Sequence, residues 1–155
     1  MPPDSRFRPP SYENGQDIRD RSFDYACDVV GFCEELTEIG GVGRMMVPQL
    51  LDCSLTFATM LEEARSAESD ADFVSKCCIG LKECRESWTR MRICERRRKG
   101  SPVAAKRLVQ EGSELIAIVG TIIAKKRASV AAKRAAEKAA KLAERAARAK
   151  RVTNS

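Results

Sequence analysis

Apolar side chains recur at steps of three and four residues along four stretches of this chain, each roughly 20 residues long. That spacing places the apolar side chains on one side of an α-helix. Strand signals are weak, because no stretch alternates apolar and polar residues and only 5% of the residues are aromatic. The sequence therefore predicts an all-α fold, an up-down-up-down four-helix bundle with a basic, Ala-rich helical C-terminal extension.

We expect these helices over residues 20–39, 46–66 and 70–98, and from residue 101 onward. The inner face of the first helix is predicted to carry Phe23, Ala26, Val30, Cys33 and Leu36.

Short polar or glycine-containing links mark the ends of the helices. Glycines at 40, 41 and 43 break the chain after the first helix. Ser69 is expected to cap the third helix, with Asp72 completing a short capping box. Ser101 is expected to cap the fourth, with Pro102 at its first position.

The charge of the chain is divided along its length. The 28 Lys and Arg residues exceed the 22 Asp and Glu residues by six. Residues 121–155 hold eleven basic and two acidic residues, a net charge of +9, which leaves −3 for the first 120 residues. We therefore expect a flexible leader at residues 1–18, a bundle at 19–124 and a basic Ala/Lys/Arg-rich tail at 125–155. This asymmetry is typical of binding to nucleic acid or another acidic partner through the tail.

The chain has no histidine, which removes the commonest general base and the commonest metal ligand. Di-iron bundles also need histidine beside their glutamates. We instead expect Glu83 and Glu86 to pair with Lys82, Arg85 or Arg90. The sequence predicts no catalytic residue, no metal site and no cofactor, so we do not expect an enzyme.

Seven cysteines are present without a C-x-x-C pair and in an odd number, which disfavours a disulfide framework. We expect most of them to be reduced, buried side chains, with a four-thiolate metal site across helices as the less favoured alternative. Residues 1–20 lack the apolar run of a secretory signal, and no apolar stretch approaches the ~20 residues of a membrane span. We therefore expect a cytoplasmic protein without a membrane partner.

The basic tail contains the strongest functional signal. Alanine, the best helix former, separates its charges. Six cations at seven-, four-, three-, four- and three-residue steps form one stripe, about 32 Å long on a helix: Arg127, Arg134, Lys138, Lys141, Arg145 and Arg148. Such a stripe can follow a phosphate backbone without reading bases, and no aromatic residue follows Trp88 to stack on them. The alternatives are a solvated tail that aids solubility, or contact with an acidic protein or membrane surface.

The predicted nucleic-acid-binding residues comprise the tail and a cluster that ends the third helix. They are Arg96, Arg97, Arg98, Lys99, Lys125, Lys126, Arg127, Lys133, Arg134, Lys138, Lys141, Arg145, Arg148, Lys150 and Arg151. The cluster also has a structural explanation, because cations are favoured at the carboxyl end of a helix.

Motifs in the middle of the chain resemble a known family. They are Gln49-Leu50-Leu51, Glu63-Ala64, Ser69-x-x-Asp72-Phe73-Val74-x-Lys76 and Ile79-x-Leu81-Lys82-Glu83-x-Arg85-Glu86-Ser87. Together they resemble the four-helix bundle protein family, which includes proteins encoded in intervening sequences of bacterial large-subunit ribosomal RNA. This family is similar to the accessory proteins of diversity-generating retroelements. The resemblance covers residues 20–125 and implies a homo-oligomer, typically a pentamer, associated with RNA or a retroelement and without catalytic activity. The chain departs from the family pattern at Asp52, Thr56 and Met60.

Two functional hypotheses follow. In the first, the protein is a non-enzymatic homo-oligomeric bundle that binds nucleic acid, RNA above all, without sequence preference through its tail. In the second, it is a protein-binding accessory scaffold, for example for a reverse transcriptase or another ribonucleoprotein enzyme. Deletion of residues 125–155 separates them, because it abolishes binding in the first and preserves the partner in the second.

Overall fold

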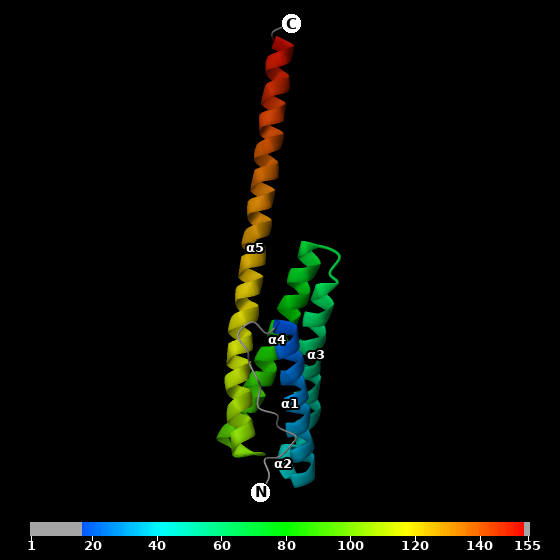
Figure 1. Cartoon of the computed structure of the whole chain (residues 1–155), viewed down its shortest axis with the longest axis vertical. Coiled ribbons are helices and arrows are strands. Elements are labelled where there is room, and N and C mark those ends of the chain that lie inside the picture. The colour runs from blue at the N-terminus through cyan, green and yellow to red at the C-terminus, as the bar shows by residue number, and fades with distance from the viewer. Residues whose placement is uncertain (1–16, 154–155) are drawn as a thin grey trace.

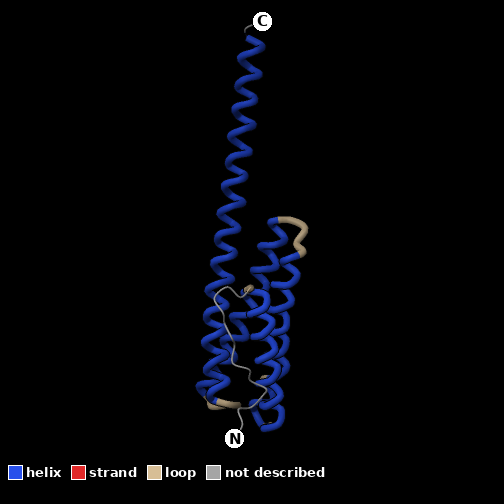
Figure 2. Tube along the Cα trace, in the orientation of Figure 1, coloured by secondary structure: helices blue, strands red, loops and turns tan. Residues whose placement is uncertain are grey.

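The described part of the chain is almost entirely helical. The computed structural model describes residues 17–153, with helices α1 (Ile18–Ile39), α2 (Gly41–Met45), α3 (Val47–Arg65), α4 (Asp70–Arg96) and α5 (Pro102–Thr153). No strand occurs within residues 17–153, which confirms the predicted all-α class (Figure 2). The leader expected at residues 1–18 lies outside the described residues except at its last two positions, where α1 begins.

The four long helices pack side by side and α5 extends far beyond the others (Figure 1). Helix α3 packs against α1 and α4, and α5 packs against the same two helices. Figure 1 shows α1 and α4 running toward the end at which α2 lies, and α3 and α5 running away from it. At 1.5 Å per residue, the 52 residues of α5 span about 78 Å.

Two of the predicted helix caps are present. The Ser69 hydroxyl accepts a hydrogen bond from the Asp72 amide at 3.0 Å and so caps α4. The Asp72 carboxylate accepts from the amide of Glu68 at 3.2 Å, one residue before the position that a capping box uses. At α5 the Ser101 hydroxyl accepts from the Ala104 amide at 3.3 Å.

The glycine-rich link after α1 differs from the expected break. Gly40 and Gly41 both have a positive φ, of +77° and +63°, but residues 41–45 already form the short helix α2. Gly43 lies so close to α1 that a Cβ atom there would be 3.2 Å from the Leu36 side chain. Tight packing on α1 therefore lets a helical turn form where glycine alone favours a loop.

The core centres on aromatic and aliphatic side chains of the four long helices. Tyr25 and Phe57 are buried and meet edge to face, with their ring centroids 6.2 Å apart. The inner face expected for α1 was wrong at Phe23, which is 63% exposed, whereas Tyr25 is 1% exposed. At 3.6 residues per turn Tyr25 lies about 20° around the helix from Leu36 and Phe23 about 140°, so the three-residue steps assumed for this helix drifted away from its buried side.

A buried chain of hydroxyl groups connects α1, α3 and α4. The Tyr25 Oη and Ser87 Oγ atoms are 2.8 Å apart, and the Ser87 and Ser54 Oγ atoms are also 2.8 Å apart. Burial raises the pKa of the Tyr25 phenol, so the group stays protonated. The three hydroxyl groups satisfy one another's hydrogen bonds, which would otherwise be lost in the core. They also favour one relative placement of the three helices.

Gly100, in the link between α4 and α5, provides a test of this packing. Its φ is +70°, and a Cβ atom there would lie 2.6 Å from the Phe32 ring. We expect Gly100→Ala to lower the free energy of unfolding by ~2–4 kcal/mol, through backbone strain and overpacking. Urea denaturation followed by circular dichroism measures it.

Gly120→Ala is the matched control, because this glycine lies within α5 and a Cβ atom there would meet nothing within 4 Å. We expect it to raise the free energy of unfolding by ~0.5–1 kcal/mol. Equal effects of the two substitutions would contradict the described link.

Candidate nucleic-acid interface

The cations of the predicted stripe lie along one uninterrupted helix. Helix α5 runs from Pro102 to Thr153, so its half that packs on the other helices and its tail share a continuous backbone. All residues from 131 to 153 are exposed. The stripe from Arg127 to Arg148 therefore faces solvent over about 32 Å.

The first half of α5 explains how a tail without a buried face can be helical. Leu108, Leu115 and Val119 are buried against the other helices and fix the start of α5. Helix nucleation is costly whereas each further residue adds a hydrogen bond, so the alanine-rich tail extends a helix that already exists.

Two tail cations also contact the body. Lys126 forms an ion pair with Asp70 at the start of α4, and its Nζ atom lies 5.5 Å from the centroid of the Phe73 ring. Hydrogen bonding to Lys126 lowers the pKa of the Asp70 carboxyl. The Arg127 guanidinium donates to the Cys78 sulfur at 3.4 Å. These contacts fix the root of the tail against α4.

A shallow cavity continues from this root between α4 and α5. It has a volume of about 490 Å³ and is lined on the α5 side by Arg127, Val130, Lys133 and Arg134. Beyond it, Lys138, Lys141, Arg145, Arg148, Lys150 and Arg151 are exposed along the projecting helix.

The structure does not bring the second predicted cluster to the tail. Arg96 ends α4, and Arg97, Arg98 and Lys99 follow in the link to α5. Lys99 lies beside α2, because its side chain is 3.9 Å from the Cβ position of Gly43. This end of the molecule is opposite the end from which the tail projects (Figure 1). The cluster and the tail therefore form two separate basic surfaces.

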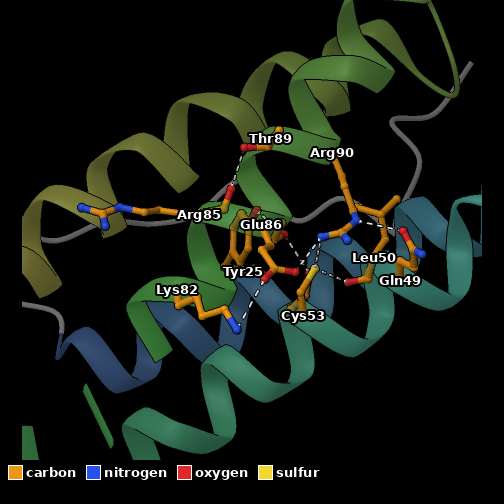
Figure 3. Close-up of polar contacts among 11 residues, drawn as sticks. Tyr25, Gln49, Leu50, Cys53, Lys82, Arg85, Glu86, Thr89 and Arg90 are labelled. Atoms are coloured by element: carbon orange, nitrogen blue, oxygen red, sulfur yellow. Dashed lines mark hydrogen bonds and ion pairs between the residues drawn. The ribbon is translucent and has the colours of Figure 1, made fainter. Parts of the chain in front are cut away.

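Polar side chains on α4 form a second network that the sequence indicated in part. Figure 3 shows Glu86 between Lys82 and Arg90, with oxygen–nitrogen distances of 3.9 and 3.1 Å. Arg90 also donates to the Gln49 side chain of α3 at 3.3 Å. The expected pairing of Glu86 is confirmed, and its partner Arg90 joins α4 to α3.

The described cysteines are all free thiols, and Cys33, Cys53, Cys77, Cys84 and Cys94 are buried. Burial raises the pKa of Cys33 and of Cys84 to about 12, so both are thiols at neutral pH. Within residues 17–153, no group of three or more potential ligand side chains is placed to hold a metal ion.

None of the helices in residues 17–153 combines the length and the apolar composition that a membrane span requires.

The buried hydroxyl groups of Tyr25, Ser54 and Ser87 were not identified from the sequence. Helical spacing to other core residues was the only signal that could have indicated them.

Comparison with known proteins establishes a fold. No protein-family model matches this chain, and no curated protein matches it. A solved structure from Bacteroides thetaiotaomicron, described as a protein of unknown function from the S23 ribosomal protein family, has the same fold with a TM-score of 0.63. The two chains are 24% identical, and the match covers 69% of this chain and 98% of that one. Membership of the narrower intervening-sequence family stays a prediction.

Thiol accessibility tests the placement of the cysteines. Cys27 is exposed and Cys78 is half-buried, whereas the other five are buried. In the monomer, we expect DTNB to label Cys27 fastest, Cys78 more slowly and the rest only after unfolding. Loss of the fast phase in Cys27→Ser identifies it, and fast labelling of that variant would contradict the described burial.

The projecting helix can be tested apart from the body. Ala139→Gly together with Ala140→Gly should lower the helicity of the tail, since each change costs about 1 kcal/mol of helix stability. We expect a smaller circular dichroism signal at 222 nm with an unchanged thermal midpoint of the body. Ala139→Gln with Ala140→Gln is the control, because glutamine is a good helix former. A lowered midpoint in the glycine variant would show that the tail packs on the body.

Proposed function

We propose that this protein is a non-enzymatic, self-associating up-down-up-down four-helix bundle that binds nucleic acid, RNA above all, through the cationic stripe of α5. The observation that carries the proposal is the stripe's position on a helix exposed on every side beyond residue 130. A rigid cationic stripe about 32 Å long can contact successive phosphates of one backbone.

The same residues indicate how such binding would work. The tail has cations but no aromatic side chain, so the interaction is electrostatic and tolerant of sequence. Neutralising about six phosphates corresponds to a slope near −5 in a plot of log affinity against log salt for duplex DNA, and less for single strands. Self-association would place several tails on one nucleic acid and raise the overall affinity.

The ribosomal family named for the structural neighbour favours RNA over DNA as the natural ligand. The cluster at residues 96–99 would be a second, weaker contact at the other end of the molecule, since it is short and lies on a link.

Salt-dependent binding of the full chain tests the proposal. Fluorescence anisotropy with a labelled RNA hairpin and a DNA duplex, at 50 to 300 mM KCl, should give steeply salt-dependent affinity. Replacement of four stripe cations by glutamine should reduce the DNA slope from near −5 to near −2, because about two phosphate contacts remain. The four substitutions are Lys138→Gln, Lys141→Gln, Arg145→Gln and Arg148→Gln.

Glu137→Gln with Glu144→Gln is the matched control on the same helix, and it should raise the affinity because it removes negative charge. Absence of binding by the wild type at 50 mM KCl, or an unchanged slope in the stripe variant, would contradict the proposal. Arg96→Gln with Arg97→Gln and Arg98→Gln measures the contribution of the second surface separately.

A further inference from the structure

The outward face of α1 is acidic and carries an exposed aromatic ring. Helix α1 has six carboxylates and two cations, and both cations lie in its first turn, where Arg19 pairs with Asp17 and Arg21 with Glu111 and Glu114. Asp20, Asp24, Glu34 and Glu38 are all exposed. Among them Phe23 is 63% exposed, although burying such a ring stabilises a protein by roughly 1.5–3 kcal/mol. An exposed apolar ring on a predominantly acidic helix face is typical of a contact surface.

The outward face of α4 has the opposite character. Lys82, Arg85 and Arg92 are exposed, and the intervening Glu86 is engaged by Arg90 and Lys82 (Figure 3). Ile93, on the same face, is 47% exposed.

A groove of about 870 Å³ follows this face of α4 and reaches α5. Its apolar lining includes Leu81, Ile93 and Ile123, and its cations include Lys82 and Arg85. The groove can therefore receive an apolar side chain that carboxylates surround.

The two faces point in opposite directions. Helices α1 and α4 each pack against both α3 and α5, so they occupy opposite corners of the body. Their inner sides face each other across the core, where Tyr25 and Ser87 are hydrogen-bonded. Figure 1 agrees, since α1 lies in front of α4 with α5 on one side and α3 on the other. One copy cannot bring its acidic face to its own basic groove.

We propose that the acidic face of α1 docks into the α4–α5 groove of a second copy, with Phe23 inserted among the apolar groove residues and the carboxylates beside Lys82 and Arg85. This inference rests on the proposed self-association and identifies its two surfaces. The contact is head to tail, because each copy offers one face and accepts the other. Such a contact closes into a ring or continues as a filament, according to the rotation between copies.

A second copy fits the groove better than a nucleic acid does. The phosphate backbone requires cations but has no use for the apolar lining, whereas the α1 face supplies both negative charge and an aromatic ring. Because the stripe residues from 134 to 148 lie outside this contact, self-association leaves the tail free to bind.

Charge reversal on each face tests the docking in the full-length protein. The α1 variant carries Asp20→Lys and Glu34→Lys, and the α4 variant carries Lys82→Glu and Arg85→Glu. All four residues are exposed, so the fold should be retained, as circular dichroism verifies. Sedimentation velocity of the wild type should show an assembly that weakens with salt. Each variant alone should sediment as the 17.2 kDa monomer.

An equimolar mixture of the two variants should associate again, because each supplies the unaltered face that the other lacks. Glu68→Lys with Glu95→Lys is the matched control, since it reverses two exposed carboxylates that lie neither on α1 nor in the groove lining and should leave the assembly intact. Failure of the mixture to associate would overturn a head-to-tail contact.

The remaining outcomes separate the docking from the proposed function. If the wild type and both variants all assemble, each on its own, the docking is overturned but self-association stays in place. A wild type that is monomeric at every concentration overturns both, while the anisotropy titration still decides nucleic-acid binding. Loss of RNA binding in the α4 variant, with its assembly unchanged, would assign the groove to nucleic acid and overturn the proposal.

Discussion

Burial of the first half of α5 determines where the functional surfaces of this protein lie. Leu108, Leu115 and Val119 hold this half against α1 and α4, and the backbone hydrogen bonds of the helix continue without interruption into the tail. The direction of the tail is therefore fixed by core packing many residues away. Contacts of Lys126 and Arg127 with α4 support the helix where it leaves the body.

The body combines an apolar core with a small polar centre. The hydroxyls of Tyr25, Ser54 and Ser87 come from three helices and satisfy one another in the absence of solvent. Apolar packing alone tolerates sliding of one helix past another, whereas a buried hydroxyl without its partner costs about 1–3 kcal/mol. At the link before α5, the absence of a side chain at Gly100 permits close contact with the Phe32 ring.

The acidic and basic side chains lie on separate surfaces of the molecule. The acidic face of α1 and the basic groove of α4 are opposite in charge and both carry apolar side chains, which suits contact between copies of the chain. The tail is cationic without an apolar stripe of large residues, which suits a phosphate backbone. Assembly through the body would thus present several tails together, and each modest electrostatic contact would gain from the others.

The sequence by itself determined the helices, the Ser69 and Ser101 caps and the cationic stripe, because each depends on interactions within a few residues of the chain. Only the tertiary structure showed that Tyr25 is buried and Phe23 exposed, because the three-residue steps assumed for the first helix drift away from its buried side. It also separated residues 96–99 from the tail and turned the α1 and α4 faces apart. These relations depend on which helices pack together, and a periodic pattern contains the direction of an apolar face but not the identity of the helix that covers it.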